Sequence, residues 1–169
     1  MPSTTTLVVM GVSGSGKTTT ALELVRLLGW DYAEGDDFHP AANVEKMRSG
    51  HPLDDDDRWP WLRSLAAWIG GHEQEGRPAI VTCSALKRSY REILTDGHDD
   101  VGFVYLKGAK DLIAERLAAR KGHFMPPQLL DSQMAALQEP EADEPSMVIA
   151  IDATPDDIVR TIVERFKTR

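Results

Sequence analysis

The chain has 169 residues, of which 41% are hydrophobic and 27% charged, a composition typical of one globular domain. Its formal net charge of −8 argues against nucleic-acid binding, which requires a basic surface. With one cysteine, Cys83, no run of 18 apolar residues and no basic-then-apolar start, we expect a cytoplasmic protein without a disulfide, signal peptide or membrane helix.

Short apolar segments alternate with segments of helical periodicity along the chain. The predicted strands are Leu7–Met10, Trp30–Ala33, Ala79–Cys83, Val101–Leu106 and Met147–Ile151. The predicted helices are Lys17–Leu28, Pro40–Arg48, Arg58–Gln74, Lys87–Leu94, Asp111–Arg120, Gln128–Gln138 and Asp156–Lys167. This alternation indicates an α/β fold in a single domain over residues 1–169, with a five-stranded parallel sheet covered by helices on both faces.

A glycine-rich octapeptide follows the first predicted strand. Its sequence, Gly11-Val12-Ser13-Gly14-Ser15-Gly16-Lys17-Thr18, fits the pattern G-x-x-x-x-G-K-[ST] with a strand before it and a helix after it. Glycines allow successive backbone N–H groups to turn toward a polyphosphate, and the helix start adds its positive end. We therefore predict that these residues and Thr19 bind ATP, with Lys17 on the outer phosphates and the Thr18 hydroxyl on Mg²⁺.

Two missing motifs narrow the class of nucleotide-binding protein. The chain has no Asn-Lys-x-Asp tetrapeptide, which GTP-binding switches use to read guanine. Its third predicted strand ends in Thr82-Cys83-Ser84, without the aspartate typical of motor ATPases. A small phosphotransferase remains, in which the second protein contact to Mg²⁺ stays open and Glu34 is a candidate.

Further motifs occur along the chain in a fixed order. They are Glu34-Gly35-Asp36-Asp37-Phe38-His39-Pro40, Asp56-Asp57-Arg58, Cys83-Ser84-Ala85-Leu86-Lys87 with Tyr90-Arg91, and Arg120-Lys121-Gly122-His123-Phe124. With the phosphate-binding loop, they resemble gluconokinases of the shikimate-kinase-like type over about residues 7–145. The resemblance implies a P-loop, nucleoside-monophosphate-kinase-like three-layer fold with an acceptor-binding insert at about 36–75 and a lid at about 116–128. It also implies Mg²⁺-dependent transfer of the terminal phosphate of ATP to the 6-hydroxyl of D-gluconate, and a homodimer.

Asp36 is the candidate carboxylate for orienting the acceptor hydroxyl and taking its proton. It follows the second predicted strand, so we expect it at the carboxyl edge of the sheet, where α/β proteins bind ligands. The resemblance indicates the same residue. The alternative is a capping role for the helix Pro40–Arg48, which we expect Asp37 to fill instead. The run Asp54–Asp57 lacks the spacing of a calcium loop and is interpreted as a cap of the following helix.

An acceptor carboxylate requires cations, for which Arg58, Lys87 and Arg91 are the candidates. Lys87 and Arg91 lie four residues apart on one predicted helix, so we expect both to point toward Asp36. The alternative is a pair of solvated helix charges. We expect His39 to donate to a substrate hydroxyl.

The basic stretch near residue 120 is the predicted lid. Arg116 and Arg120 are expected to close over the phosphates, with Arg120 neutralising charge in the transition state, and His123 is assigned to the acceptor. The alternative is that these cations only stabilise a helix C-terminus. The resemblance places Thr154 and Pro155, in the loop after the last strand, beside adenine.

Two other functions remain open at this point. One is a kinase acting on shikimate or a nucleoside monophosphate, although Cys83-Ser84-Ala85 replaces the glycine-rich turn expected of shikimate kinases. The other is an ATP-binding regulatory module without turnover.

Overall fold

The computed structural model describes residues 4–119 and 127–167. Its centre is a five-stranded parallel sheet with the order β2-β3-β1-β4-β5. The strands are β1 (Thr6–Met10), β2 (Asp31–Glu34), β3 (Ala79–Thr82), β4 (Val101–Lys107) and β5 (Ser146–Ala150). The predicted fold class is confirmed, and each strand lies within one residue of its expected bounds.

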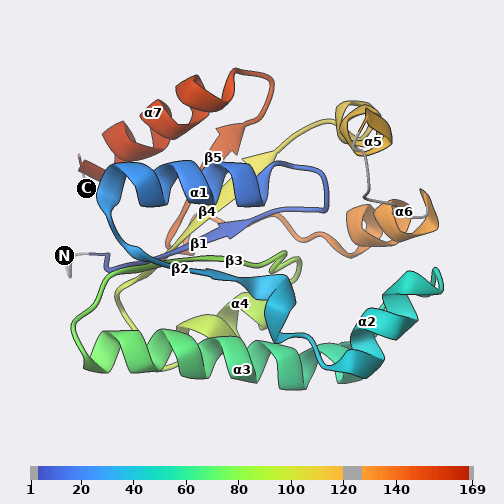
Figure 1. The fold of residues 1–169 in the computed structure, drawn as a ribbon, viewed down its shortest axis with the longest axis horizontal. Helices are drawn as coiled ribbons and strands as arrows, with labels where there is room; N and C mark the ends of the chain where they lie inside the picture. The colour runs from blue at the N-terminus through green and yellow to red at the C-terminus, as the bar shows by residue number, and fades with distance from the viewer. Residues whose placement is uncertain (1–3, 120–126, 168–169) are drawn as a thin grey trace.

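Helices cover both faces of the sheet (Figure 1). One face carries α1 (Lys17–Leu28) and α7 (Pro155–Lys167), and the other carries α3 (Asp55–Gln74) and α4 (Arg88–Thr95). The remaining elements gather beyond the carboxyl ends of the strands: a 3₁₀ helix η1 (Gly35–Phe38), α2 (Ala41–Arg48), α5 (Lys110–Ala119) and α6 (Pro127–Ala136). The 3₁₀ helix was not predicted.

Most residues of the central strands are apolar because both faces of the sheet are covered there. The exceptions include Thr6, Thr82 and Lys107. Every residue of β1 and β3 is buried, as are the first six residues of β4. The edge strand β2 is only partly buried along its whole length. The two buried strands β1 and β3 pair in parallel, with Val9 opposite Thr82 at their carboxyl ends.

The acidic run before α3 caps that helix, as predicted. The Asp54 side chain accepts from the Asp57 backbone N–H at 2.8 Å, and the Asp57 carboxylate accepts from the Asp54 N–H at 2.9 Å, which forms a capping box. The helix therefore begins at Asp55, three residues earlier than expected, and Pro60 lies in its second turn rather than its first. The buried residues Leu62 and Leu65 show that α3 is a main layer of the fold as well as part of the expected insert.

Among residues 4–119 and 127–167, no helix combines the length and the apolar character needed to cross a membrane.

Candidate active site

A cavity of about 750 Å³, called here the main cavity, opens where the segments after β1, β2 and β3 meet α2, α3 and α6. It contains many of the residues predicted from sequence to bind nucleotide or acceptor. Its lining is Ser13, Gly14, Gly16, Lys17, Thr18, Glu34, Asp36, Asp37, His39, Val44, Met47, Arg48, Pro52, Leu53, Arg58, Trp61, Ser84, Leu86, Leu117, Leu129, Ser132 and Gln133.

The phosphate-binding loop forms one wall of the main cavity. Gly14 and Gly16 have φ of 84° and 95°, which is left-handed backbone that favours glycine. A Cβ at Gly14 would also lie 2.6 Å from Leu117 Cγ of α5. Lys17 Nζ donates to the carbonyls of Gly11 and Val12 at 3.0 and 3.1 Å, so the ammonium group lies over the loop.

The remaining predicted loop residues do not line the main cavity. Gly11, Val12 and Ser15 are buried members of the loop, and Thr19 is exposed on α1. Their role toward ATP stays a prediction.

Gln133 of α6 holds the loop from the other side. Its side-chain oxygen accepts from the Ser13 N–H at 2.7 Å, and its amide nitrogen donates to the Ser13 hydroxyl at 3.1 Å. The oxygen and the nitrogen of the Gln133 side-chain amide therefore both bond to Ser13 of the phosphate-binding loop. This contact was not predicted, because nothing in the sequence near α6 indicates that Gln133 packs against a residue 120 positions earlier in the chain.

Glu34, at the end of β2, lies beside Thr18. Its carboxylate accepts from the Thr18 hydroxyl at 2.9 Å and from the Tyr32 hydroxyl. Burial and the neighbouring carboxylate raise the pKa of Tyr32 above its ordinary value, so the phenol keeps its proton and donates it. A hydroxyl and a carboxylate side by side are oxygen ligands of the kind that Mg²⁺ takes in proteins. The donor set fits the ion.

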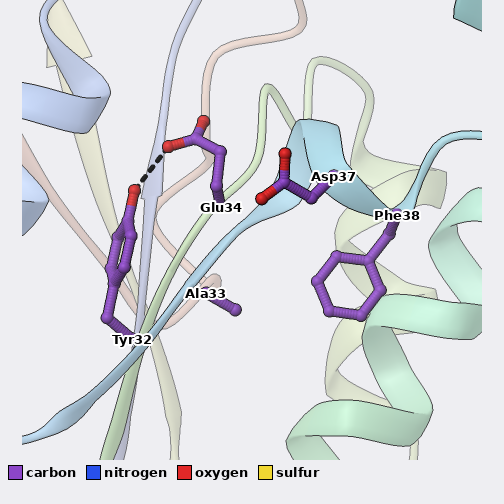
Figure 2. Close-up of a pocket in the computed structure, with 5 residues that line it drawn as sticks. All are labelled: Tyr32, Ala33, Glu34, Asp37 and Phe38. Atoms are coloured by element: carbon purple, nitrogen blue, oxygen red, sulfur yellow. Dashed lines mark hydrogen bonds between the residues drawn. The ribbon is translucent and has the colours of Figure 1, made fainter.

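A smaller cavity of about 380 Å³ adjoins this point and is lined by Tyr32, Ala33, Glu34, Asp37 and Phe38 (Figure 2). The carboxylates of Glu34 and Asp37 extend from the same side of the ribbon, and the Phe38 ring points away from them. Phe38 packs edge-on against Trp68 of α3, with ring centroids 6.5 Å apart. Asp37 does not cap α2 as expected, because the N-cap is Pro40 and has no side-chain cap bond.

Asp36 lies in η1, directly after β2, and reaches the main cavity. Its position depends on Gly35, where a Cβ would fall 1.9 Å from the Thr82 carbonyl oxygen. The Gly35 N–H donates to the Thr82 hydroxyl at 3.0 Å, and its carbonyl accepts from the Trp61 indole at 2.8 Å. The turn that carries Asp36 is thus fixed against β3 and α3, while the Asp36 side chain is 78% exposed.

Of the three cations predicted to bind the acceptor, Arg58, in the first turn of α3, lines the main cavity. Its Nη1 donates to the Tyr90 hydroxyl at 2.9 Å, and that hydroxyl donates in turn to Asp55. Lys87 Nζ also donates to Asp55, at 3.1 Å. The Tyr90 hydroxyl therefore fixes the Arg58 guanidinium, and it is itself held by Asp55, which also pairs with Lys87.

Lys87 and Arg91 do not converge on Asp36 as expected. Lys87 is bound to Asp55 and does not line the main cavity. The Arg91 side chain, only 2% exposed, forms two hydrogen bonds to the Glu144 carboxylate, at 2.6 and 3.2 Å. Arg91 is thus committed to a buried ion pair, which corrects its assignment to the acceptor.

The same arginine supports the turn after β3. Its Nη1 donates to the Ala85 carbonyl at 2.8 Å. Ala85 has φ of 46°, a left-handed conformation that costs about 1–3 kcal/mol for a residue with a Cβ. Because Ser84 and Leu86 on either side line the main cavity, Arg91 shapes the site without entering it.

The predicted lid is described only in part. Arg120 and His123 lie outside the described residues. Arg116 Nη2 donates to the Ile151 carbonyl at 2.8 Å, just before the loop expected to contact adenine. In that loop, Thr154 Oγ1 accepts from the Asp157 N–H at 3.2 Å and Pro155 begins α7, so both have structural roles. Their contact with adenine stays a prediction.

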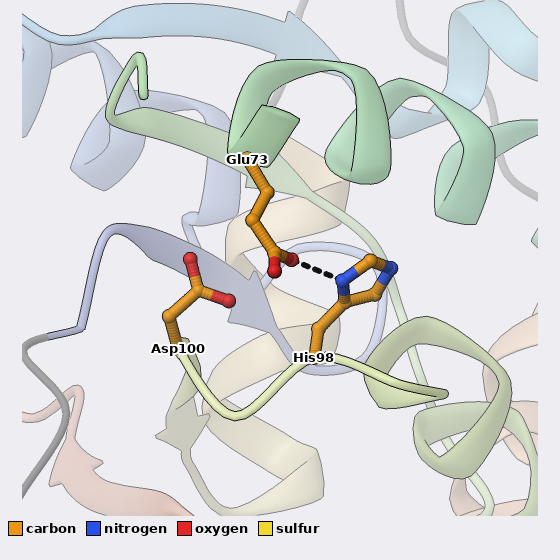
Figure 3. Close-up of side chains that lie close together, drawn as sticks. All are labelled: Glu73, His98 and Asp100. Atoms are coloured by element: carbon orange, nitrogen blue, oxygen red, sulfur yellow. Dashed lines mark ion pairs between the residues drawn. The ribbon is translucent and has the colours of Figure 1, made fainter. Parts of the chain in front are cut away.

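A separate cluster of ionisable side chains lies away from the main cavity. Glu73 near the end of α3 forms a close pair with His98, and Asp100 lies beside them before β4 (Figure 3). The Asp100 carboxylate also accepts from the Thr5 hydroxyl. These contacts tie α3 to the starts of β1 and β4, and we assign no metal to them.

Comparisons with known proteins identify the family. A protein-family profile described as "AAA domain" matches residues 7–140. A gluconokinase of Gluconobacter oxydans is 47% identical over 95% of this chain and 90% of its own length. The thermoresistant gluconokinase of Escherichia coli is 45% identical over 95% and 92%. The crystal structure of a gluconokinase from Sinorhizobium meliloti superposes with a TM-score of 0.86 at 40% identity, covering 99% of this chain and 93% of that one.

The fold and the phosphate-binding loop thus define a P-loop kinase. Within that class, the chain belongs to the gluconokinase family.

Proposed function

We propose that this protein transfers the terminal phosphate of ATP to the 6-hydroxyl of D-gluconate. The observation that carries the proposal is the main cavity, in which the phosphate-binding loop faces an exposed carboxylate, Asp36, and a cation, Arg58. A phosphate donor and an acidic sugar require these three features within one space. The relatives named gluconokinase support gluconate as the acceptor.

On the nucleotide side, backbone N–H groups of the loop and Lys17 would bind the phosphates. Thr18 and Glu34 would hold Mg²⁺, directly or through water, and the bound ion would neutralise charge on the phosphates. In this proposal Arg116 and Arg120 belong to the lid, and Thr154 and Pro155 lie next to adenine.

On the acceptor side, Asp36 would orient the attacking hydroxyl and accept its proton. Arg58 would bind the gluconate carboxylate, for which a guanidinium offers two parallel donors. Arg58 and Asp36 both line the main cavity but lie on different elements, α3 and η1. One acceptor molecule in this cavity can therefore contact both groups.

The function is tested by following ADP release with gluconate, shikimate, other sugar acids and nucleoside monophosphates as acceptors. We expect gluconate to give the highest kcat/KM. Preferred turnover of another acceptor would reassign the substrate. Tight ATP binding without release of ADP for any acceptor would indicate a regulatory module instead.

The role of Arg58 is tested by Arg58→Ala. Hydrogen bonds to charged groups contribute about 1.5–3 kcal/mol, so we expect the KM for gluconate to rise roughly 10-fold to 100-fold with little change in the KM for ATP. Tyr90→Phe, which removes the hydroxyl behind Arg58, should give a smaller rise of the same kind. Arg63→Ala, at an exposed position of the same helix, is the matched control. Equal KM values for Arg58→Ala and Arg63→Ala would remove Arg58 from the acceptor site.

A further inference from the structure

His39 lies in a rigid setting beside Asp36. Its side chain is only 4% exposed, and its ring stacks on Trp61 with centroids 4.1 Å apart and planes 16° from parallel. Trp61 is itself fixed by its bond to the Gly35 carbonyl. The directions in which the two ring nitrogens point are therefore set by packing.

Asn43 of α2 determines which ring nitrogen carries the proton. Its side chain is buried, and its amide nitrogen donates to the Asp57 carbonyl at 2.8 Å. A carbonyl only accepts, so the –NH₂ group must face it, and this settles the orientation of the amide. The same –NH₂ group lies 3.3 Å from His39 Nδ1. Because nitrogen of this amide can only donate, Nδ1 must be the acceptor, and the ring proton resides on Nε2.

The protonated nitrogen faces the candidate base. His39 Nε2 lies 3.9 Å from Asp36 Oδ1, and the exposed Asp36 side chain can rotate to shorten this distance. Among the described residues, Asp36 and Arg58 are the charged groups that act on the ring. Burial lowers the pKa of His39, Arg58 lowers it further and Asp36 opposes them, with a lowered value as the result. The lowered pKa favours the neutral form of the ring at pH 7.

We propose that Asn43 and His39 form a positioning pair for Asp36, in which Asn43 holds the ring proton on Nε2 and that N–H steadies the Asp36 carboxylate. The pair rests on the role proposed for Asp36 above. A neutral donor suits a general base, because it orients the carboxylate without the full positive charge that would weaken its basicity. In this proposal His39 acts through Asp36 and need not contact the acceptor. This differs from the sequence prediction, in which His39 donates to a substrate hydroxyl.

The first test reads the tautomer directly. In ¹⁵N-labelled protein at pH 7.5, long-range proton–nitrogen correlation spectra should show the His39 ring as neutral with its proton on Nε2. A ring protonated on Nδ1, or doubly protonated, would overturn the proposal. This measurement requires no turnover, so it stands apart from the acceptor assay. If the protein does not phosphorylate gluconate but shows the expected tautomer, the proposed function is wrong and the proposed Asn43–His39 hydrogen bond is retained.

The second test asks whether Asn43 acts through His39. Misplacing a reacting group can cost up to about 10²-fold in rate, so we expect Asn43→Ala to lower kcat about 10-fold to 10²-fold with the KM for ATP unchanged. In a His39→Gln background, where the glutamine amide can donate in place of Nε2–H, the same change should cost less than about 3-fold.

Equal losses in the two backgrounds would overturn the proposal, as would an unaltered His39 tautomer in Asn43→Ala. Ala42→Ser, at the exposed neighbouring position of α2, is the control for perturbing the helix. If thermal melting shows that Asn43→Ala does not fold, the spectrum of the unmodified protein decides the question alone.

Discussion

Asp36→Asn is expected to lower kcat by about 10²-fold to 10⁴-fold while leaving the affinity for ATP nearly intact. The amide keeps the size of the side chain but cannot accept the proton of the attacking hydroxyl. The affinity should survive because the phosphate-binding loop is held by its own contacts to Lys17 and Gln133 and not by Asp36. Steady-state kinetics for both substrates, together with ATP titration of the variant, provide the measurement.

Asp37→Asn is the matched comparison for that variant. Asp37 is the next residue of η1 and also reaches the main cavity, but it lines the smaller cavity with Phe38 as well. If Asp37→Asn loses more turnover than Asp36→Asn, the base has been assigned to the wrong one of the two carboxylates.

Replacing Arg91 is expected to have the largest effect on stability. Arg91→Met leaves the Glu144 carboxylate, only 7% exposed, without its cation, and breaking a buried pair in this way costs about 3–5 kcal/mol. The left-handed turn at Ala85 also loses its hydrogen bond. Urea unfolding at pH 7 measures the loss. A midpoint equal to that of the unmodified protein would mean that the pair contributes nothing.

The pH dependence of this loss provides a second check. Burial on its own raises the pKa of Glu144 and is the largest single effect. The hydrogen bonds from Arg91 and from the Glu141 backbone N–H, together with the charges of Arg91 and Arg88, still hold that pKa below the ordinary value. A depressed folded-state pKa stabilises the protein above the unfolded value of about 4.3, and this contribution disappears as the pH falls further. Without Arg91, burial raises the pKa of Glu144 instead. Arg91→Met therefore loses the most unfolding free energy at neutral pH, where the unpaired carboxylate would be charged.

We therefore expect the difference in unfolding free energy between the unmodified protein and Arg91→Met to be smaller at pH 5 than at pH 7. Arg88→Met, which removes pairs to Asp143 and Glu141 at the surface of the same helix, should show a much smaller loss at both pH values. A gap that widens on acidification would contradict this account.

The positions of the residues that follow β1 and β2 in the main cavity were predicted correctly, and their roles stay predictions. The phosphate-binding loop follows β1 and Asp36 follows β2, and the carboxyl ends of parallel strands share one edge of the sheet. Local pattern thus sufficed to bring Lys17, Thr18, Glu34 and Asp36 together.

Residues whose role depends on partners far away in the sequence were not predicted correctly. Lys87 and Arg91 have the expected helical spacing, but their partners Asp55 and Glu144 lie 32 and 53 residues away. Whether a cation faces substrate or a buried carboxylate is decided by tertiary packing, which periodicity does not report. Trp61 of α3 bonds to the Gly35 carbonyl, 26 residues earlier in the chain, and this contact was not predicted. Its buried indole N–H, which needs an acceptor, was the available signal for its link to Gly35.

The tight approach of Gly35 to β3 bears on any attempt to redirect this enzyme to other acids. No side chain fits at that position without displacing the main chain of Thr82, so libraries that vary it would yield misplaced turns rather than new specificities. Diversity belongs instead at Met47, Arg48 and Leu53, which line the main cavity from α2 and the segment after it. There, a change of size or charge can alter which acid is accepted while the phosphate-transfer machinery stays in place.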